Sequence, residues 1–100
     1  MSFAFTQNDK FEELPKKIRD YLPTFFENRK QDFNEIENAF IELNYQVIRD
    51  YCHKQLGVAQ CYNCFKLHEI VTVLQSYARE ENGGQVKAIY SQLKSYLNSL

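Results

Sequence analysis

The chain has 100 residues, 44% of them hydrophobic, with 12 Lys and Arg against 13 Asp and Glu. This length predicts a single domain, too small for an ATP-binding catalytic domain, and the balanced charge gives no basic surplus for nucleic acid. No signal peptide and no run of 18 apolar residues occur, so we expect no membrane partner. An odd count of three Cys favours a reducing compartment, and we expect a cytoplasmic protein.

The composition predicts helices, because eight Phe and seven Tyr accompany few alternating runs of Val, Ile and Thr. The first expected element is a short N-terminal helix that Pro15 interrupts. Its apolar residues are Phe11, Leu14, Ile18, Tyr21 and Leu22. The second is a helix over residues 23–44, with Pro23 in its first turn, where the missing N–H of proline is tolerated. Its apolar residues are Phe26, Phe33, Ile36, Phe40 and Leu43.

Three further helices follow in chain order. Asn44 is expected to cap a helix that ends near residue 62, and its apolar face contains Ile48, Tyr51, Cys52, Ala59 and Tyr62. The next helix covers residues 64–82, and its apolar face contains Leu67, Ile70, Val71, Leu74, Tyr77 and Ala78. Asn82, Gly83 and Gly84 are expected to end it in a left-handed conformation. The last helix covers residues 85–100.

Helices joined by turns this short fold back on one another. The sequence therefore predicts an all-α fold, an antiparallel up-and-down four-helix bundle with an additional short N-terminal helix. The whole chain, residues 1–100, forms the single domain.

His53 lies outside the apolar face of its helix, about 140° around the helix axis from Ile48. Gly57 follows one turn later on the same side, although a glycine inside a helix costs about 1 kcal/mol relative to alanine. Its missing side chain leaves the imidazole open to a partner. A neutral imidazole is a good nucleophile near neutral pH. The pattern therefore predicts a reactive histidine on a docking face formed by Arg49, Asp50, Leu56, Gly57 and Gln60 around His53.

The segment CHKQLGVAQCYNCFKL, residues 52–67, resembles the AHxLKGxAxxxGxxxL pattern of histidine-containing phosphotransfer (HPt) domains. The similarity extends to LPTFFENRKQDFNEIENAFIEL before it and LQSYAREEN after it. His53 matches the phosphorylated histidine and Gly57 the glycine one turn later. Leu56 stands where the family has a lysine, and Asn63 stands where it has a glycine. The resemblance assigns the missing lysine's role to Lys54, and it implies that Gln75 hydrogen-bonds the imidazole.

The resemblance implies a phosphorelay function in two-component signalling. His53 would accept a phosphoryl group from the aspartate of a receiver domain and pass it to another receiver. The expected partners are response-regulator receiver domains or a hybrid sensor kinase. The chain would need no cofactor of its own, because Mg²⁺ is expected on the receiver.

Two other functions remain open at this point. Leu56 favours a degenerate HPt domain that binds a partner without transferring phosphate. Cys61, Cys64 and His68 instead form a CxxCxxxH spacing that is typical of zinc ligands, so a zinc-stabilised helical domain is the second alternative. Zinc would need a fourth ligand, and the apolar faces are long enough to form a core without metal. We therefore expect no metal site.

Overall fold

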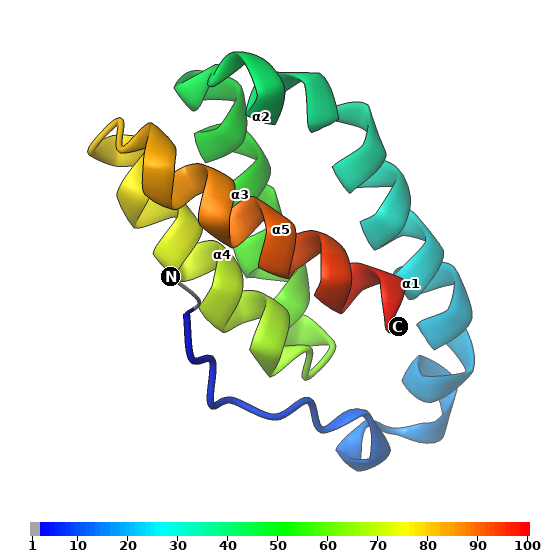
Figure 1. Ribbon diagram of the computed structural model, residues 1–100. Coiled ribbons are helices and arrows are strands. Elements are labelled where there is room, and N and C mark those ends of the chain that lie inside the picture. Colours follow the sequence, from blue (N-terminus) through cyan, green and yellow to red (C-terminus); the bar gives the residue numbers. More distant parts are fainter. Residues whose placement is uncertain (1–2) are drawn as a thin grey trace.

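The computed structural model describes residues 3–100, and these residues form helices and turns without a strand (Figure 1). The expected all-helical class is confirmed. The elements are a 3-10 helix, Phe11–Glu13, and five α-helices: α1 (Lys16–Glu35), α2 (Glu37–Glu42), α3 (Tyr45–Cys61), α4 (Phe65–Arg79) and α5 (Gly83–Asn98). Among the residues from 3 to 100, no helix combines the length and the apolar character that a membrane crossing requires.

The core is centred on α4, which packs against α3 and α5. α3 and α4 form a hairpin joined by residues 62–64, and α5 packs against both α4 and α1 (Figure 1). The expected apolar faces of α4 and α5 are buried, since Leu67, Leu74, Ile89 and Leu93 have no exposed surface. Burying one such side chain contributes about 1.5–3 kcal/mol. These three helices therefore contribute most of the buried hydrophobic side chains.

The N-terminal half differs from the expected boundaries. α1 is continuous from Lys16 to Glu35 and contains Pro23, whereas Pro15 occupies the position before its first residue. Proline interrupts a helix because it leaves the carbonyl one turn earlier without a donor. Here that carbonyl belongs to Arg19, and both Arg19 and Pro23 are exposed, so water can take the missing donor's place. The prediction of a separate short helix interrupted by Pro15 is therefore wrong.

The helix expected over residues 23–44 is also divided. α1 ends at Glu35, Ile36 takes a non-helical conformation with φ of −112° and ψ of 11°, and α2 begins at Glu37. The bend turns Ala39 and Phe40 into the core, where both are buried. Tertiary packing of α2 thus overrides the regular apolar spacing that suggested one helix.

The α4–α5 connection corrects a third boundary. Glu81, with φ of 53°, is the left-handed residue, and Asn82 caps α5 by accepting a hydrogen bond from the Gln85 N–H at 3.2 Å. Gly83 begins α5 and has no positive φ. A Cβ there would lie 2.8 Å from Leu43 Cδ1, so close packing against the α2–α3 turn accounts for this glycine.

The two ends of α3 match the expectation. Asn44 caps the helix, and its Oδ1 accepts a hydrogen bond from the Val47 N–H at 3.3 Å. Asn63 takes the left-handed conformation after the helix, with φ of 53°. Asparagine tolerates that conformation better than most residues, so it replaces a glycine here with little strain.

Candidate functional site

His53 is exposed on the outer side of α3, and Gly57 is exposed one turn further along. A Cβ added to Gly57 would meet no atom within 4 Å. The fold therefore does not need a glycine at this position, although alanine would favour the helix by about 1 kcal/mol. Packing inside the protein therefore does not explain why residue 57 lacks a side chain beside His53.

The other residues of the expected docking face surround His53 as the helix geometry predicts. Asp50 and Gln60 are exposed, whereas Arg49 and Leu56 are half-buried. The Arg49 Nη2 donates to Gln46 Oε1 at 2.8 Å, and its Nη1 reaches the carbonyl of Ala78 at 3.5 Å. Arg49 is thus held along α3 and toward the end of α4.

The two residues expected to assist His53 differ in their surroundings. The ammonium of Lys54 lies 3.1 Å from Asp32 Oδ2 on α1, so it is directed away from the His53 face. Gln75 is half-buried on α4. Among residues 3–100, no hydrogen bond joins Gln75 to His53.

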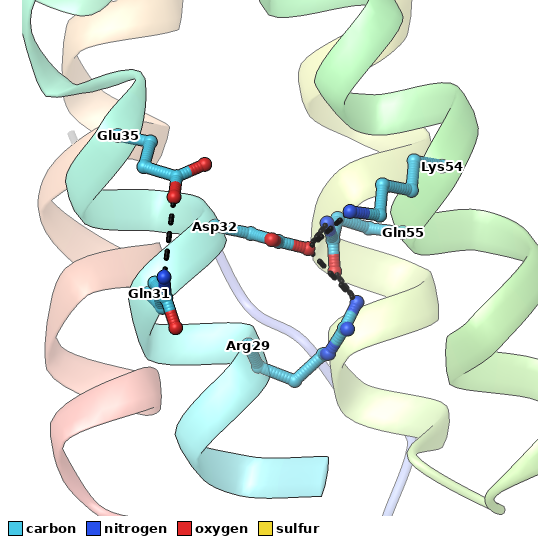
Figure 2. Close-up of polar contacts among 6 residues, drawn as sticks. All are labelled: Arg29, Gln31, Asp32, Glu35, Lys54 and Gln55. Atoms are coloured by element: carbon cyan, nitrogen blue, oxygen red, sulfur yellow. Dashed lines mark hydrogen bonds and ion pairs between the residues drawn. The ribbon is translucent and has the colours of Figure 1, made fainter.

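Behind this face lies a buried polar cluster of Arg29, Asp32 and Gln55, which we call the α1–α3 polar cluster (Figure 2). Gln55 accepts a hydrogen bond from Arg29 Nη1 at 2.6 Å and donates to Asp32 Oδ2 at 3.0 Å. Arg29 and Asp32 also form an ion pair at 3.3 Å, and the guanidinium lies over the ring of Phe25. Gln55 has no exposed surface, so its amide forms these hydrogen bonds away from water.

Lys54 joins the polar cluster from outside. Its side chain is 61% exposed, whereas that of Asp32 is only 16% exposed. Asp32 already has Arg29 and Gln55 as partners, so its charge remains compensated when Lys54 moves away. The Lys54–Asp32 pair borders a groove of about 260 Å³ between α1 and α3 that Glu35, Val47 and Asp50 also line.

The sequence analysis did not identify the polar cluster, although the spacing contained a signal. Gln55 falls on the buried face of α3, seven residues after Ile48 and four before Ala59. Arg29 similarly falls four residues before Phe33 on the buried side of α1. Two polar residues within apolar faces of adjacent helices indicate a buried pair, because each needs a hydrogen-bonding partner away from water.

The three residues of the zinc alternative lie in different environments. Cys61 is exposed and His68 half-buried, whereas Cys64 is buried with its Sγ 2.9 Å from the hydroxyl oxygen of Tyr96. Burial raises the pKa of the Cys64 thiol to about 12. Within residues 3–100, no three side chains of His, Cys, Asp or Glu gather as they would around a metal ion.

Comparison with models of known protein families finds no match, and comparisons with curated proteins and with solved structures find no significant match either. Function is therefore argued from the residues of this chain.

Replacing Gln55 with leucine should lower the free energy of unfolding by about 2–3 kcal/mol, because Arg29 and Asp32 then lose a buried partner each. Urea denaturation followed by circular dichroism measures the change. Gln60→Leu is the matched control, since Gln60 is exposed on the same helix. Equal stability of the two variants would show that the polar cluster does not hold α1 to α3.

The stability of the protein should fall above about pH 9. Burial raises the pKa of Cys52 and of Cys64 from the ordinary value of 9.0 to about 12. Between these pH values the folded state therefore keeps two protons that the unfolded chain releases. The contribution of the two buried thiols to the free energy of unfolding is complete below pH 9 and is lost toward pH 12. Each thiol contributes a slope of about 1.4 kcal/mol per pH unit in this window.

Urea denaturation between pH 7 and 11 measures this slope. Cys52→Ala should reduce the slope of the free energy of unfolding against pH by the contribution of one thiol. Cys61→Ala, at an exposed position, should leave this slope unchanged. The pKa values of Tyr51 and Tyr96 are also raised by burial, so both residues steepen the loss above pH 10. A stability independent of pH up to 11 would contradict the burial of these groups.

Proposed function

We propose that this protein is a histidine phosphotransfer protein of a phosphorelay. His53 accepts a phosphoryl group from the aspartate of a receiver domain and passes it to the aspartate of another receiver. In this proposal α1 with α2, then α3, α4 and α5 act as an antiparallel up-and-down four-helix bundle, as the resemblance to HPt domains implies.

The observation that supports the proposal most is the open backbone of Gly57 beside an exposed His53. An exposed histidine alone is common. A glycine inside a helix with no packing reason is uncommon, because it lowers helix stability without compensation in the fold. A partner that approaches α3 closely gives this glycine a purpose.

The phosphoryl transfer to His53 requires few groups of this chain. A nitrogen of the neutral imidazole attacks the phosphorus of the receiver's aspartyl phosphate, an N–P bond forms, and the acyl O–P bond breaks with the carboxylate as leaving group. The receiver brings Mg²⁺ to neutralise the phosphoryl oxygens. This chain contributes a positioned nucleophile and a docking face, so catalysis depends on orientation and on nearby charge.

Lys54 is the cation that can assist His53 in this scheme. It would exchange its ion pair with Asp32 for one with the phosphoryl group on His53. The exchange costs little on the side of Lys54, because its side chain is 61% exposed and water solvates the ammonium when it leaves Asp32. Asp32 keeps Arg29 and Gln55, and Gln75 on α4 remains available to hydrogen-bond the imidazole.

A second candidate is a non-catalytic HPt-like module that binds a receiver and blocks transfer. The half-buried Leu56 favours it, because an apolar side chain on the face of His53 strengthens docking and supplies no charge to a phosphoryl group. The two functions share a binding surface and differ only in whether phosphate reaches His53.

Mixing the protein with phosphorylated receiver domains should add one acid-labile, base-stable phosphate, detected by intact mass. His53→Gln should abolish this addition and leave the helices folded. His68→Gln is the matched control and should keep the phosphate. Transfer to the His53 variant would refute the assignment, and binding without transfer to the unaltered protein would select the non-catalytic module.

Substitutions of Gly57 should separate stability from function. Gly57→Ala should raise the free energy of unfolding by about 1 kcal/mol, because the site is open and alanine favours a helix. Gly57→Leu should keep the fold and slow phosphotransfer by about tenfold or more, because the added side chain holds the receiver away from His53. Gly84→Leu, at an exposed position in α5, serves as the control. Unchanged transfer in Gly57→Leu would show that no partner approaches this surface.

A further inference from the structure

Residues 3–10 form an extended segment, here called the N-terminal strap, that runs past the α3–α4 turn and along α4 and α5 (Figure 1). Each end is held by a reciprocal pair of hydrogen bonds. The Phe3 N–H donates to Gln92 Oε1 at 2.7 Å, and Gln92 Nε2 donates to the Phe3 carbonyl at 2.8 Å. The Lys10 N–H donates to the Asn63 carbonyl at 3.0 Å, and Asn63 Nδ2 donates to the Lys10 carbonyl at 3.1 Å.

Asp9 attaches the strap to both helices. Its Oδ1 accepts a hydrogen bond from the backbone N–H of Lys66 at 2.9 Å, and its Oδ2 accepts one from the Tyr96 hydroxyl at 2.8 Å. Cys64, at the cap position of α4, makes no side-chain cap bond. The strap therefore supplies the carboxylate that caps α4, where the free N–H groups and the helix dipole favour a negative charge.

Cys64 is linked to this attachment through Tyr96. The Tyr96 hydroxyl gives its proton to Asp9, so the thiol of Cys64 donates to the Tyr96 oxygen at 2.9 Å. Cys64 has no exposed surface. Three side chains thus connect the strap, the start of α4 and the end of α5 in one chain of hydrogen bonds.

The strap has few other anchors. Phe3 and Phe5 are half-buried and face the helices, whereas Ala4 and residues 6–8 are exposed. Phe3 contacts the ring of Tyr77 at a centroid distance of 5.8 Å, and both Phe3 and Phe5 line an open groove of about 540 Å³ against α5. A segment without helical hydrogen bonds and with half-buried anchors opens more readily than a helix of the core.

We propose that the N-terminal strap is a releasable latch: when Asp9 leaves Lys66 and Tyr96 and Phe3 leaves Gln92, residues 3–9 lift from α4 and α5. The helices stay folded, the Lys10–Asn63 pair stays closed, and Cys64 becomes accessible. The closed latch hides the thiol and caps α4. The open latch exposes the thiol and the apolar surface beneath Phe3 and Phe5. This device does not depend on the phosphotransfer function proposed above.

The three cysteines allow a test with internal references. Cys61 is exposed, Cys64 is buried and hydrogen-bonded to Tyr96, which holds Asp9, and Cys52 is buried on α3. Iodoacetamide labelling, followed residue by residue by mass spectrometry, should modify Cys61 first, Cys64 more slowly and Cys52 last. Asp9→Ala should accelerate labelling of Cys64 by about tenfold to a hundredfold, because a charge-assisted anchor is lost, and should leave Cys52 unchanged.

Asn8→Ala is the matched control, since Asn8 is an exposed neighbour on the same strap, and it should not change the rate of Cys64. Equal acceleration of Cys52 and Cys64 in Asp9→Ala would overturn the proposal, because the whole protein then unfolds together. An unchanged Cys64 rate would overturn it as well. If Asp9→Ala does not fold, Gln92→Ala releases the other end of the strap and should accelerate Cys64 selectively.

Hydrogen exchange gives a second measurement. The Lys66 amide should exchange faster in Asp9→Ala than in the unaltered protein, because its acceptor is lost, whereas the Leu74 amide in the middle of α4 should stay protected. Loss of protection at both amides would show that α4 itself unfolds and would contradict the latch.

Discussion

The hydrogen bonds of Gln55 to α1 act together with the buried apolar face of α3 to set how this helix is rotated in the molecule. The amide is bound on both sides, by Arg29 and by Asp32, so α3 cannot turn about its axis without leaving a buried polar group unpaired. His53 lies two residues before Gln55, on the opposite side of the helix, and its exposure follows from this rotation. The candidate site is therefore set by contacts made on the far face of its own helix.

The same cluster defines the charge near the site. Asp32 is the acceptor for Arg29, Lys54 and Gln55 together, and only Lys54 among these donors is largely exposed. A buried charge with two internal partners does not need the third. The exposed ammonium of Lys54 thus pairs with a carboxylate that Arg29 and Gln55 already hold inside the protein.

Much of the fold could be predicted from the sequence, because apolar spacing reports which side of a helix is buried. The faces of α4 and α5, the cap at Asn44 and the exposure of His53 and Gly57 are confirmed for this reason. The continuation of α1 through Pro23 and the bend at Ile36 could not be predicted, since both depend on which carbonyls face water and on how α2 packs. Gln55 was missed because apolar residues alone were counted, and the strap was missed because its partners lie far away in the chain.

The three tight turns of the helical region are each closed by a residue other than glycine. Leu43, Asn63 and Glu81 all have φ of 53°, a conformation that opposes the backbone preference of leucine and glutamate by about 1–2 kcal/mol. The side chain of Leu43 packs over Gly83 at the start of α5. The corner at Asn63 agrees with local preference, whereas the corners at Leu43 and Glu81 oppose it. Backbone hydrogen bonds close these two corners, from the Asn44 N–H to the Ala39 carbonyl at 2.8 Å and from the Asn82 N–H to the Tyr77 carbonyl at 3.0 Å. The α3–α4 hairpin can thus close on local preference alone, whereas the α2–α3 and α4–α5 connections carry a local cost that the rest of the fold offsets.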